Sequence, residues 1–389
     1  MTKAIRFKTL VLVVSLLAAH VIGLTQDSTR GSQTLTAIGP ALESIQADKI
    51  LEHIKILASD KFEGRNTGSK GEILTVNYLV DQFKRAGLKP GNPDGTYVQK
   101  VPLVGFLSQP QIELSINGTK LPLKFMEDFV HESPRLRPHV SVKNSGVVFA
   151  GYGIVAPDYG WDDYKGVDVR NKLVILLGGE PSFQDKNDPS KADKSMFRGD
   201  DRTVYSTREV KNEIALKKGA AAVLFITDPS KSDSFSIFQT FARLEALSLR
   251  PKAEPRAELA MTGLLTIDAA RRIFKACGED FENLRTFAEK EDFKPVLTIA
   301  LANLSIKTKL RNVMSQNVVA RLDGSDPKLK SEYLIYTAHW DHLGIDKSLK
   351  GDQIYNGAID NAIGTASLVE MSKAFAKVQP GLKRSVLFI

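Results

Sequence analysis

Residues 336–364 read YTAHWDHLGIDKSLKGDQIYNGAIDNAIG, and this stretch decides how we expect the chain to fold. His339 and Asp341 follow the apolar run 333–338, and Asp360 stands at the start of a predicted helix. Imidazole and carboxylate groups are the ligands that a hydrolytic zinc site uses. The stretch therefore indicates a metal site. The plainer interpretation is a surface histidine beside ordinary turn aspartates.

The flanking segments predict a parallel α/β unit. Nearly continuous apolar runs, typical of strands covered on both faces, occupy residues 317–322, 333–339 and 385–389. Between the last two, residues 361–379 carry apolar side chains at helical spacing. Strand, crossover helix and strand make a parallel pair. We therefore expect an α/β fold with a mostly parallel central sheet flanked by helices. His339 should then lie at the carboxyl end of a strand, where such sheets bind ligands.

The segments that come earlier in the chain predict further helices and a strand-rich region. Residues 41–65 and 67–91 have apolar residues at helical spacing and predict two amphipathic helices. From about Val101, short alternating runs separated by Gly, Pro, Asn and Asp are typical of strands. His53, in the first predicted helix, is interpreted as a packed or surface histidine rather than a metal ligand.

Composition argues against several classes of function. The 389-residue chain is 42% hydrophobic and 25% charged, which is typical of a folded protein with two or more domains. Its net charge of +8 is spread among acidic residues, so we expect no nucleic-acid partner. The chain lacks a G-x-x-x-x-G-K-[ST] loop, a G-x-S-x-G elbow and an H-E-x-x-H helix. The single cysteine, Cys277, allows no internal disulfide.

The N-terminus has the layout of a secretory signal peptide. A short basic segment, residues 1–8, precedes the apolar run 9–24 and a polar stretch. Gly23, with Val21 two positions before it, offers a cleavage point. We therefore expect residues 1–23 to be removed and the mature protein to be exported, to the periplasm or the medium, with no membrane association after cleavage. A retained membrane anchor is the alternative.

The three residues of the opening stretch suit different tasks in a metal site. A neutral imidazole binds zinc well when a carboxylate holds its other ring nitrogen, and Asp341 is placed to give His339 that support. A carboxylate at Asp360 is favoured by the N-terminus of the predicted helix. It could also bridge two metal ions at the ~3.5–4 Å spacing of two-metal hydrolases.

AHWDHLGI at 338–345 and NGAIDNAIGTASLVEMSKAFA at 356–376 resemble the family-28 metallopeptidases, di-zinc aminopeptidases related to glutamate carboxypeptidase and the transferrin receptor. LASDKFEGRNTGSKGE at 57–72 is similar to the N-terminal part of the same peptidase domain. Residues 145–181 resemble the protease-associated domain that many members carry as an insert. The resemblance implies a signal peptide at 1–23, an N-terminal part of the peptidase domain at 40–125, a β-rich protease-associated insert at 126–300 and the peptidase core at 305–389.

The resemblance also implies a role for each site residue. His339 matches the first zinc ligand, Asp341 the acid that orients it, and Asp360 the aspartate that bridges two Zn²⁺ ions. Ile359 stands where relatives often have a second aspartate, and His342 matches a frequent neighbour. Neither of these two is expected to bind metal. The complete site of the family holds two zinc ions.

The end of the chain departs from the family pattern. In the family, the strand that matches residues 385–389 leads into a loop with two adjacent glutamates, the general base and a zinc ligand. An aspartate and a last histidine come later still. Because a zinc hydrolase needs both metal and base, we expect this chain to be a C-terminally truncated fragment that binds zinc poorly and does not hydrolyse peptides alone. An uncovered sheet edge should also make its core unstable.

The function implied by the resemblance is that of an exported aminopeptidase, which hydrolyses peptide bonds with a zinc-activated water. Peptides would be its substrates, and the sequence does not indicate an oligomeric state. Two alternatives stay open: a non-catalytic binding protein like the transferrin receptor, and a zinc acyltransferase like glutaminyl cyclase. The presence of His339, Asp341 and Asp360 argues against the first alternative, and the inserted domain argues against the second.

Overall fold

The computed structural model describes residues 38–132, 135–185, 187–188, 190–230, 232–249 and 258–389. The predicted signal peptide at 1–23 lies outside these residues. The chain forms two compact units. The split unit consists of the segments up to Lys100 and from Gln316 onward, and the central unit is Val101–Ser315. In the described ranges, no helix combines the length and the apolar character needed to cross a membrane.

The split unit contains a four-stranded sheet, whose order is β1 (Lys89–Pro90), β13 (Ala320–Leu322), β17 (Ser385–Phe388) and β14 (Tyr333–Tyr336). β14 and β17 pair in parallel, so the predicted strand–helix–strand unit is confirmed. β13 pairs with β17, and β1 with β13, in the antiparallel sense. The sheet is therefore mixed, because the connection from β13 to β14 reverses the chain without a crossover helix.

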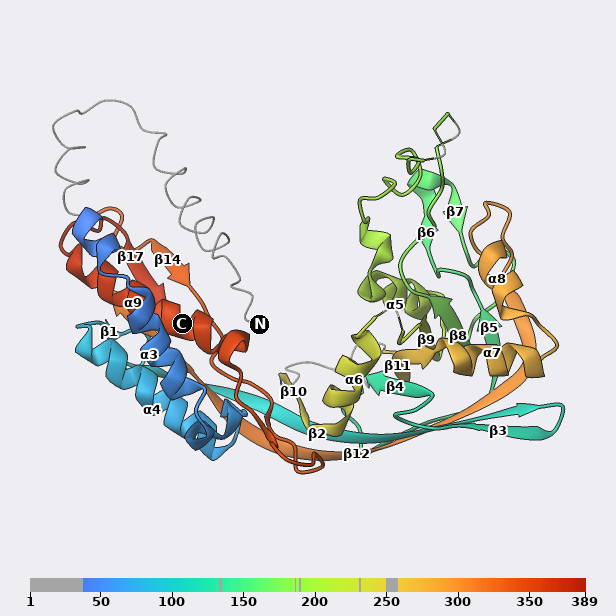
Figure 1. Ribbon diagram of the computed structural model, residues 1–389, viewed down its shortest axis with the longest axis horizontal. Coiled ribbons are helices and arrows are strands. Elements are labelled where there is room, and N and C mark those ends of the chain that lie inside the picture. Colours follow the sequence, from blue (N-terminus) through green and yellow to red (C-terminus); the bar gives the residue numbers. More distant parts are fainter. Residues whose placement is uncertain (1–37, 133–134, 186, 189, 231, 250–257) are drawn as a thin grey trace, which may run out of the picture. The chain divides into compact units, whose positions relative to one another are not determined.

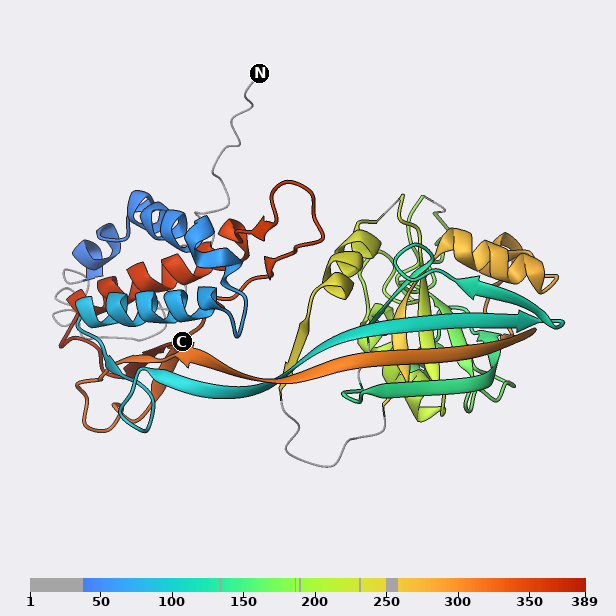
Figure 2. The ribbon, with the colours of Figure 1, turned by 90° about the horizontal axis from the view of Figure 1, so that it is seen from below.

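Three helices flank this sheet: α3 (Ala47–Leu57), α4 (Lys70–Arg85) and α9 (Ile363–Lys377). α9 packs against α3 and α4 (Figures 1 and 2). α4 begins after Ser69, whose Oγ accepts a hydrogen bond from the amide of Gly71. The core between these helices and the sheet includes the buried residues Val76, Leu79, Phe83, Val369, Val386 and Phe388. The predicted α/β class is confirmed.

The single helix predicted at 41–65 is wrong in two places, because residues 44–46 separate a first helical segment at 38–43 from α3 and because α3 does not continue past Leu57. α3 ends at Leu57, and the chain then turns through the short helix η1 (Asp60–Arg65). Glu63, Gly64 and Arg65 have φ values of 51°, 64° and 50°. A right-handed helix cannot pass through three consecutive residues in the left-handed region. The apolar spacing of the segment gave no sign of this turn.

The central unit is built on a sheet of nine strands, counted over the described residues. Its order is β10 (Ala246–Leu249), β2 (Val98–Ile116), β12 (Val296–Val318), β5 (His139–Phe149), β8 (Leu173–Leu177), β9 (Ala222–Thr227), β11 (Met261–Thr266) and β4 (Phe129–Glu132), with β3 (Thr119–Leu123) paired to β2. β5, β8, β9 and β11 are parallel neighbours. Its helices include α5 (Arg208–Lys217), α6 (Ser234–Arg243), α7 (Ile267–Ala276) and α8 (Phe281–Phe287).

The central strands of this sheet are buried on both faces. On β8, Leu173, Ile175 and Leu177 belong to one core cluster, and Val174 and Leu176 belong to another. Because successive side chains of a strand point to opposite faces, a strand buried on both sides must be apolar throughout. This explains why β8 is a continuous apolar run in the sequence.

The structure divides the chain at different positions from those predicted for the insert. The central unit runs from Val101 to Ser315, whereas the resemblance implied residues 126–300. The difference arises because β2 and β12 are long strands that continue the same sheet beyond both implied limits.

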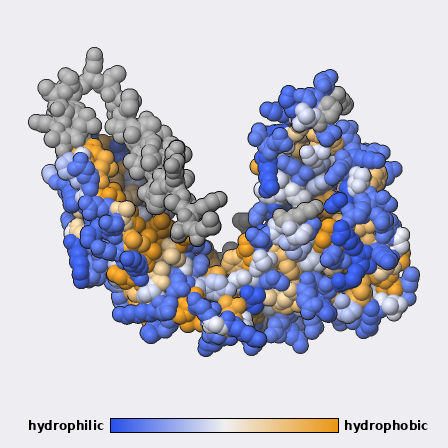
Figure 3. All heavy atoms as spheres, in the orientation of Figure 1, coloured by the Kyte–Doolittle hydropathy of each residue, from blue (hydrophilic) through white to orange (hydrophobic). Residues whose placement is uncertain are grey.

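Strand β14 leaves apolar side chains at the surface of the split unit. It is the last strand in the order of the four-stranded sheet, among the strands that the structure describes. Leu334 is 48% exposed and Ile335 is 57% exposed. Figure 3 shows apolar surface on this unit where β14 and α9 lie.

Candidate metal site

The predicted site residues lie where two loops of the split unit meet. His339 comes shortly after β14, near the carboxyl end of a parallel strand, as expected. Asp360 lies in the short helical turn η4 (Ala358–Ala362), which leads into α9. Between the two loops the chain forms a hairpin of β15 (Gly344–Ile345) and β16 (Ile354–Tyr355). The hairpin returns the chain, so residues 21 positions apart come into contact.

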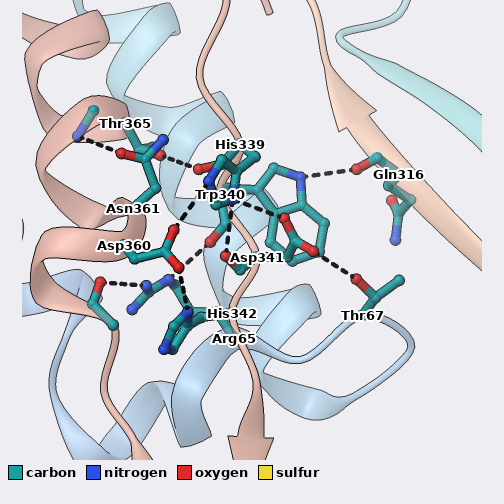
Figure 4. Close-up of polar contacts among 12 residues, drawn as sticks. Arg65, Thr67, Gln316, His339, Trp340, Asp341, His342, Asp360, Asn361 and Thr365 are labelled. Atoms are coloured by element: carbon teal, nitrogen blue, oxygen red, sulfur yellow. Dashed lines mark hydrogen bonds and ion pairs between the residues drawn. The ribbon is translucent and has the colours of Figure 1, made fainter. Parts of the chain in front are cut away.

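His339 contacts a carboxylate through each of its ring nitrogens (Figure 4). Its Nδ1 is 3.2 Å from Asp341 Oδ1, and its Nε2 is 3.2 Å from Asp360 Oδ1. When Nδ1 carries the proton and donates it to Asp341, Nε2 presents a lone pair to Asp360. Two acceptors at this distance need a proton or a cation between them. The donor set therefore fits a zinc ion held by His339 Nε2 and an oxygen of Asp360.

The side chains of the two candidate ligands, His339 and Asp360, are open to solvent. The side chains of His339 and Asp360 are 55% and 68% exposed. His342 also faces Asp360, but its Nδ1 is 3.6 Å from Asp360 Oδ2, which is too far for a hydrogen bond. Burial lowers the pKa of His342, and the Asp360 carboxylate acts against this shift. Within the part of the chain that the structure describes, no group of three or more His, Cys, Asp or Glu residues is placed to hold a metal ion.

Hydrogen bonds from neighbouring elements hold the His339 loop. Thr365 Oγ1, on α9, donates to the carbonyl oxygen of His339 at 3.0 Å. Trp340 Nε1 donates to the carbonyl oxygen of Gln316 at 3.0 Å. Thr67 Oγ1 is 3.5 Å from Asp341 Oδ2, at the outer limit of a hydrogen bond. Figure 4 shows these contacts around the site.

Sequence reasoning missed Arg65 as a residue of this site. Its guanidinium group donates to the carbonyl oxygens of Trp340 and Gly357, in the two loops that carry His339 and Asp360. The sequence did contain a signal for Arg65. The residue lies in EGR, within the segment 57–72 that resembles the peptidase family, but the resemblance assigned no role to it.

His53 is a packed histidine, as interpreted from the sequence. Its Nδ1 is 2.5 Å from Tyr78 Oη, and its Nε2 is 3.0 Å from Glu370 Oε1. Lys373 Nζ lies 2.6 Å from the same Glu370 oxygen. His53 thus belongs to a buried network between α3, α4 and α9, and none of these contacts involves the site residues.

Residues 317–389 match the family model described as Peptidase family M28. The match spans β13, β14, both site loops, α9 and β17. Over these residues the chain is similar to that family, and the resemblance inferred from the sequence is confirmed there. No curated protein matches the chain.

The chain is also similar to several solved structures. An aminopeptidase from Aneurinibacillus sp. strain AM-1 is 18% identical, with a TM-score of 0.43, over 89% of this chain and 62% of that one. BSAP, a zinc aminopeptidase from Bacillus subtilis, is 14% identical, with a TM-score of 0.38, over 88% of this chain and 60% of that one. A peptidase M28 precursor from Shewanella amazonensis SB2B is 15% identical, with a TM-score of 0.43, over 91% and 66% of the two chains. The chain spans less than two thirds of each of these structures.

Proposed function

We propose that the protein is a zinc-dependent exopeptidase, an aminopeptidase that hydrolyses peptide bonds with a zinc-activated water. The observation that carries the proposal is the convergence of His339 Nε2 and Asp360 Oδ1, 3.2 Å apart, beyond the carboxyl end of β14. The match of residues 317–389 to Peptidase family M28 supports the reaction class.

The arrangement of His339, Asp341 and Asp360 suits the binding of zinc. Zinc, when bound, lowers the pKa of a water molecule and polarises a scissile carbonyl. Asp341 accepts the Nδ1 proton of His339, which selects the tautomer that leaves Nε2 free to bind metal. Asp360 points one oxygen at His339 and the other at His342. Its carboxylate is therefore suited to bridge two zinc ions, which we propose as the number in the complete site.

Metal binding is the first test of this function. The chain should be dialysed against zinc, and the bound metal should be measured by elemental analysis and calorimetry. We expect His339→Ala and Asp360→Asn to weaken zinc binding by tenfold or more, because each removes a ligand. His139→Ala removes an exposed histidine of the central unit and serves as the control. Equal zinc binding by all variants would place the metal elsewhere.

Hydrolysis is the second test. The same proteins should be assayed on amino-acid 4-nitroanilides with a free α-amino group and on the N-acetylated counterparts. An aminopeptidase cleaves only the free-amine series, and chelation followed by zinc addition should abolish and restore the rate. Cleavage that survives both chelation and Asp360→Asn would contradict the proposal.

We also propose that the protein is exported and that the central unit contains a protease-associated domain. The basic and apolar segments at 1–23 support export, and residues 145–181 support the domain. Mass spectrometry of the protein produced in its natural host should find an N-terminus that follows Gly23. A mature protein that still begins at Met1 would count against cleavage of a signal peptide.

A further inference from the structure

Arg65 is a charged side chain with no solvent exposure, and main-chain carbonyl oxygens surround its guanidinium group. Its relative exposure is 0%. Nε donates to Trp340 O at 2.8 Å, and Nη2 donates to Gly357 O at 2.8 Å. Nη1 donates to Leu57 O and to Asn356 O, each at 2.6 Å. A buried guanidinium group is costly unless its donors are satisfied, and here hydrogen bonds engage four of its five N–H groups.

Three of these carbonyl oxygens, those of Trp340, Asn356 and Gly357, belong to the two loops that form the candidate site. The fourth, that of Leu57, lies at the end of α3. Trp340 is the residue between His339 and Asp341, and Gly357 lies three residues before Asp360. One side chain therefore joins the loop of the proposed terminal ligand to the loop of the proposed bridging ligand. The fork geometry of a guanidinium group can serve both loops at once.

The residues next to Arg65 extend this connection. The main-chain oxygen of Arg65 accepts a hydrogen bond from the amide of His342 at 3.3 Å. Asn66 Nδ2 donates to Leu343 O at 3.0 Å. Thr67 Oγ1 reaches Asp341 Oδ2 at 3.5 Å. The segment 65–67 thus contacts the His339 loop along its whole length.

The packing around Arg65 leaves no room for movement. A Cβ on Gly357 would lie 2.6 Å from Arg65 Nη2 and 2.6 Å from His342 Cδ2. A Cβ on Gly64 would lie 2.5 Å from the carbonyl oxygen of Tyr355 in β16. The left-handed backbone at Glu63 and Arg65 is itself unfavourable. The fold keeps this turn because the contacts of Arg65 compensate for it.

Electrostatics adds a second link to the site. The charges of Asp341 and Asp360 both favour the protonated guanidinium group, while burial lowers its pKa. The positive charge of Arg65 in turn reduces the repulsion between these two carboxylates. The guanidinium group therefore acts on both the geometry and the charge of the pair.

We propose that Arg65 is a positioning residue, which sets the separation of His339 and Asp360 by holding their loops together and thereby raises the affinity of the site for its metal ion. This inference rests on the proposed function for the identity of the metal. The proposed role is positioning only, because the guanidinium group of Arg65 contacts neither the candidate ligand atoms of His339 and Asp360 nor a substrate.

The first experiment uses Arg65→Lys in the 389-residue chain. Lysine keeps the charge but cannot reach four carbonyl oxygens in two loops. We expect zinc affinity, measured by calorimetry, to fall by about 10- to 100-fold. In the metal-free chain, we expect the amides of His342 and Ala362 to exchange with deuterium roughly tenfold faster. The control is Val76→Ala, a core variant of α4 that lowers the stability of the same unit without touching either loop.

A second pair of variants tests the same link from the opposite side, in case Arg65→Lys does not fold. Gly357→Ala places a methyl group 2.6 Å from Arg65 Nη2 and equally close to Asp360 O and His342 Cδ2, at a residue with a φ of 61°, so its effect is compared with that of Arg65→Lys rather than taken alone. Gly351→Ala, in the loop between β15 and β16, changes another glycine with a positive φ of 84° but meets no atom within 4 Å. We expect Gly357→Ala to weaken zinc binding by about tenfold or more and Gly351→Ala to leave it unchanged.

The outcomes separate this inference from the proposed function. If the wild-type chain binds no zinc, the proposed function fails, while amide exchange in the metal-free chain still tests whether Arg65 holds the two loops together. If the wild-type chain binds zinc and both Arg65→Lys and Gly357→Ala bind it equally well, with unchanged exchange, the inference is overturned. A loss in Arg65→Lys that Val76→Ala reproduces would overturn it as well, since stability alone would then explain the effect.

Discussion

One imidazole ring connects the two acidic residues of the site. His339 faces Asp341 through Nδ1 and Asp360 through Nε2, at 3.2 Å in both cases. A neutral ring has only one N–H, so the nitrogen that carries it cannot bind the metal. In the proposed zinc site, Asp341 would therefore select Nε2 of His339 as the ligand by accepting a hydrogen bond from Nδ1, although Asp341 is not itself the predicted ligand.

Asp341→Asn tests this role. The amide can still contact Nδ1, but it no longer requires a proton there, so the ring loses its preference for the metal-binding tautomer. We expect zinc affinity to fall about 10- to 100-fold, as for other residues that support a ligand. Calorimetry measures the affinity, and Asp352→Asn, in the loop between β15 and β16, is the matched control. An affinity equal to that of the wild-type chain would remove Asp341 from the site.

The residues that the sequence could and could not predict differ in a physical way. His339 and Asp360 were predictable because a strand, a crossover helix and the residues at their junction leave a readable pattern. Arg65 was not, because its partners are main-chain carbonyl oxygens, which every residue has. A side chain that recognises backbone imposes no residue type on its partners, so no spacing in the sequence reveals it.

Among the helices, α3 and α9 share a buried polar network around His53 and Glu370. Burial lowers the pKa of His53, and the hydrogen bond to Glu370 acts against this shift. Lys373 and His53 lower the pKa of Glu370, although burial alone would raise it. Both groups therefore bind protons less readily in the folded protein than in the unfolded chain.

The sign of the pH dependence follows from these shifts. The unfolded chain takes up a proton at His53 as the pH falls through 6.5, while the folded protein resists it. Stability from His53 is then present above this pH and is lost below it, by at most ~1.4 kcal/mol per pH unit. Glu370 adds a loss in the same direction below pH 4.5.

His53→Gln keeps a polar side chain at this position but does not titrate there. We expect the free energy of unfolding of the wild-type chain to fall more steeply than that of the variant between pH 7.5 and 5.5. Urea titrations at several pH values give both slopes, and His139→Gln, at an exposed position, should retain the wild-type slope. Equal slopes for wild type and His53→Gln would show that the network does not contribute.

The α4 helix shows how packing decides the stability of the split unit. Phe83 is buried, and its ring lies 6.4 Å from that of Phe388 on β17. Phe83→Ala should lower the free energy of unfolding by about 3–5 kcal/mol, because it removes a buried ring and leaves a cavity. Ile73→Ala, at an exposed position of the same helix, should change it by less than about 0.5 kcal/mol. Similar losses for both variants in urea titrations would contradict the packing described here.

The elements that were predicted well are those with strong periodicity. The parallel pair of β14 and β17, with α9 between them, followed from two apolar runs and a helical pattern. The helix predicted at 41–65 failed because apolar spacing continues through Phe62, whereas α3 ends at Leu57 and the backbone enters the left-handed region at Glu63. Tertiary contacts of Arg65, which local spacing does not contain, select that turn.

For the whole molecule, the sequence indicated a division into parts but not its limits. Residues 126–300 were expected as the insert, whereas the central unit includes everything from Val101 to Ser315. β2 runs through the observed limit at Val101, and β12 runs through both the expected limit at 300 and the observed limit at Ser315. A continuous strand gives no change of pattern at a domain border, so composition could not locate it.

The exposed edge of the four-stranded sheet makes a prediction about the solution behaviour of the 389-residue chain. Among the described strands, β14 has a partner on one side, and Leu334 and Ile335 are exposed. An edge strand with apolar side chains favours pairing between copies of a chain. We therefore expect the chain to associate as its concentration rises, and we expect Ile335→Lys to reduce this association, since a charge opposes edge-to-edge pairing.

Sedimentation velocity over a range of concentrations measures this effect. The matched control is Ile237→Lys, which puts the same charge at an exposed apolar position on the helix α6 rather than on a strand. If net charge alone governed association, both variants would reduce it equally, because each adds one positive charge to a chain that already carries +8. A reduction in Ile335→Lys alone would instead assign the association to the β14 edge.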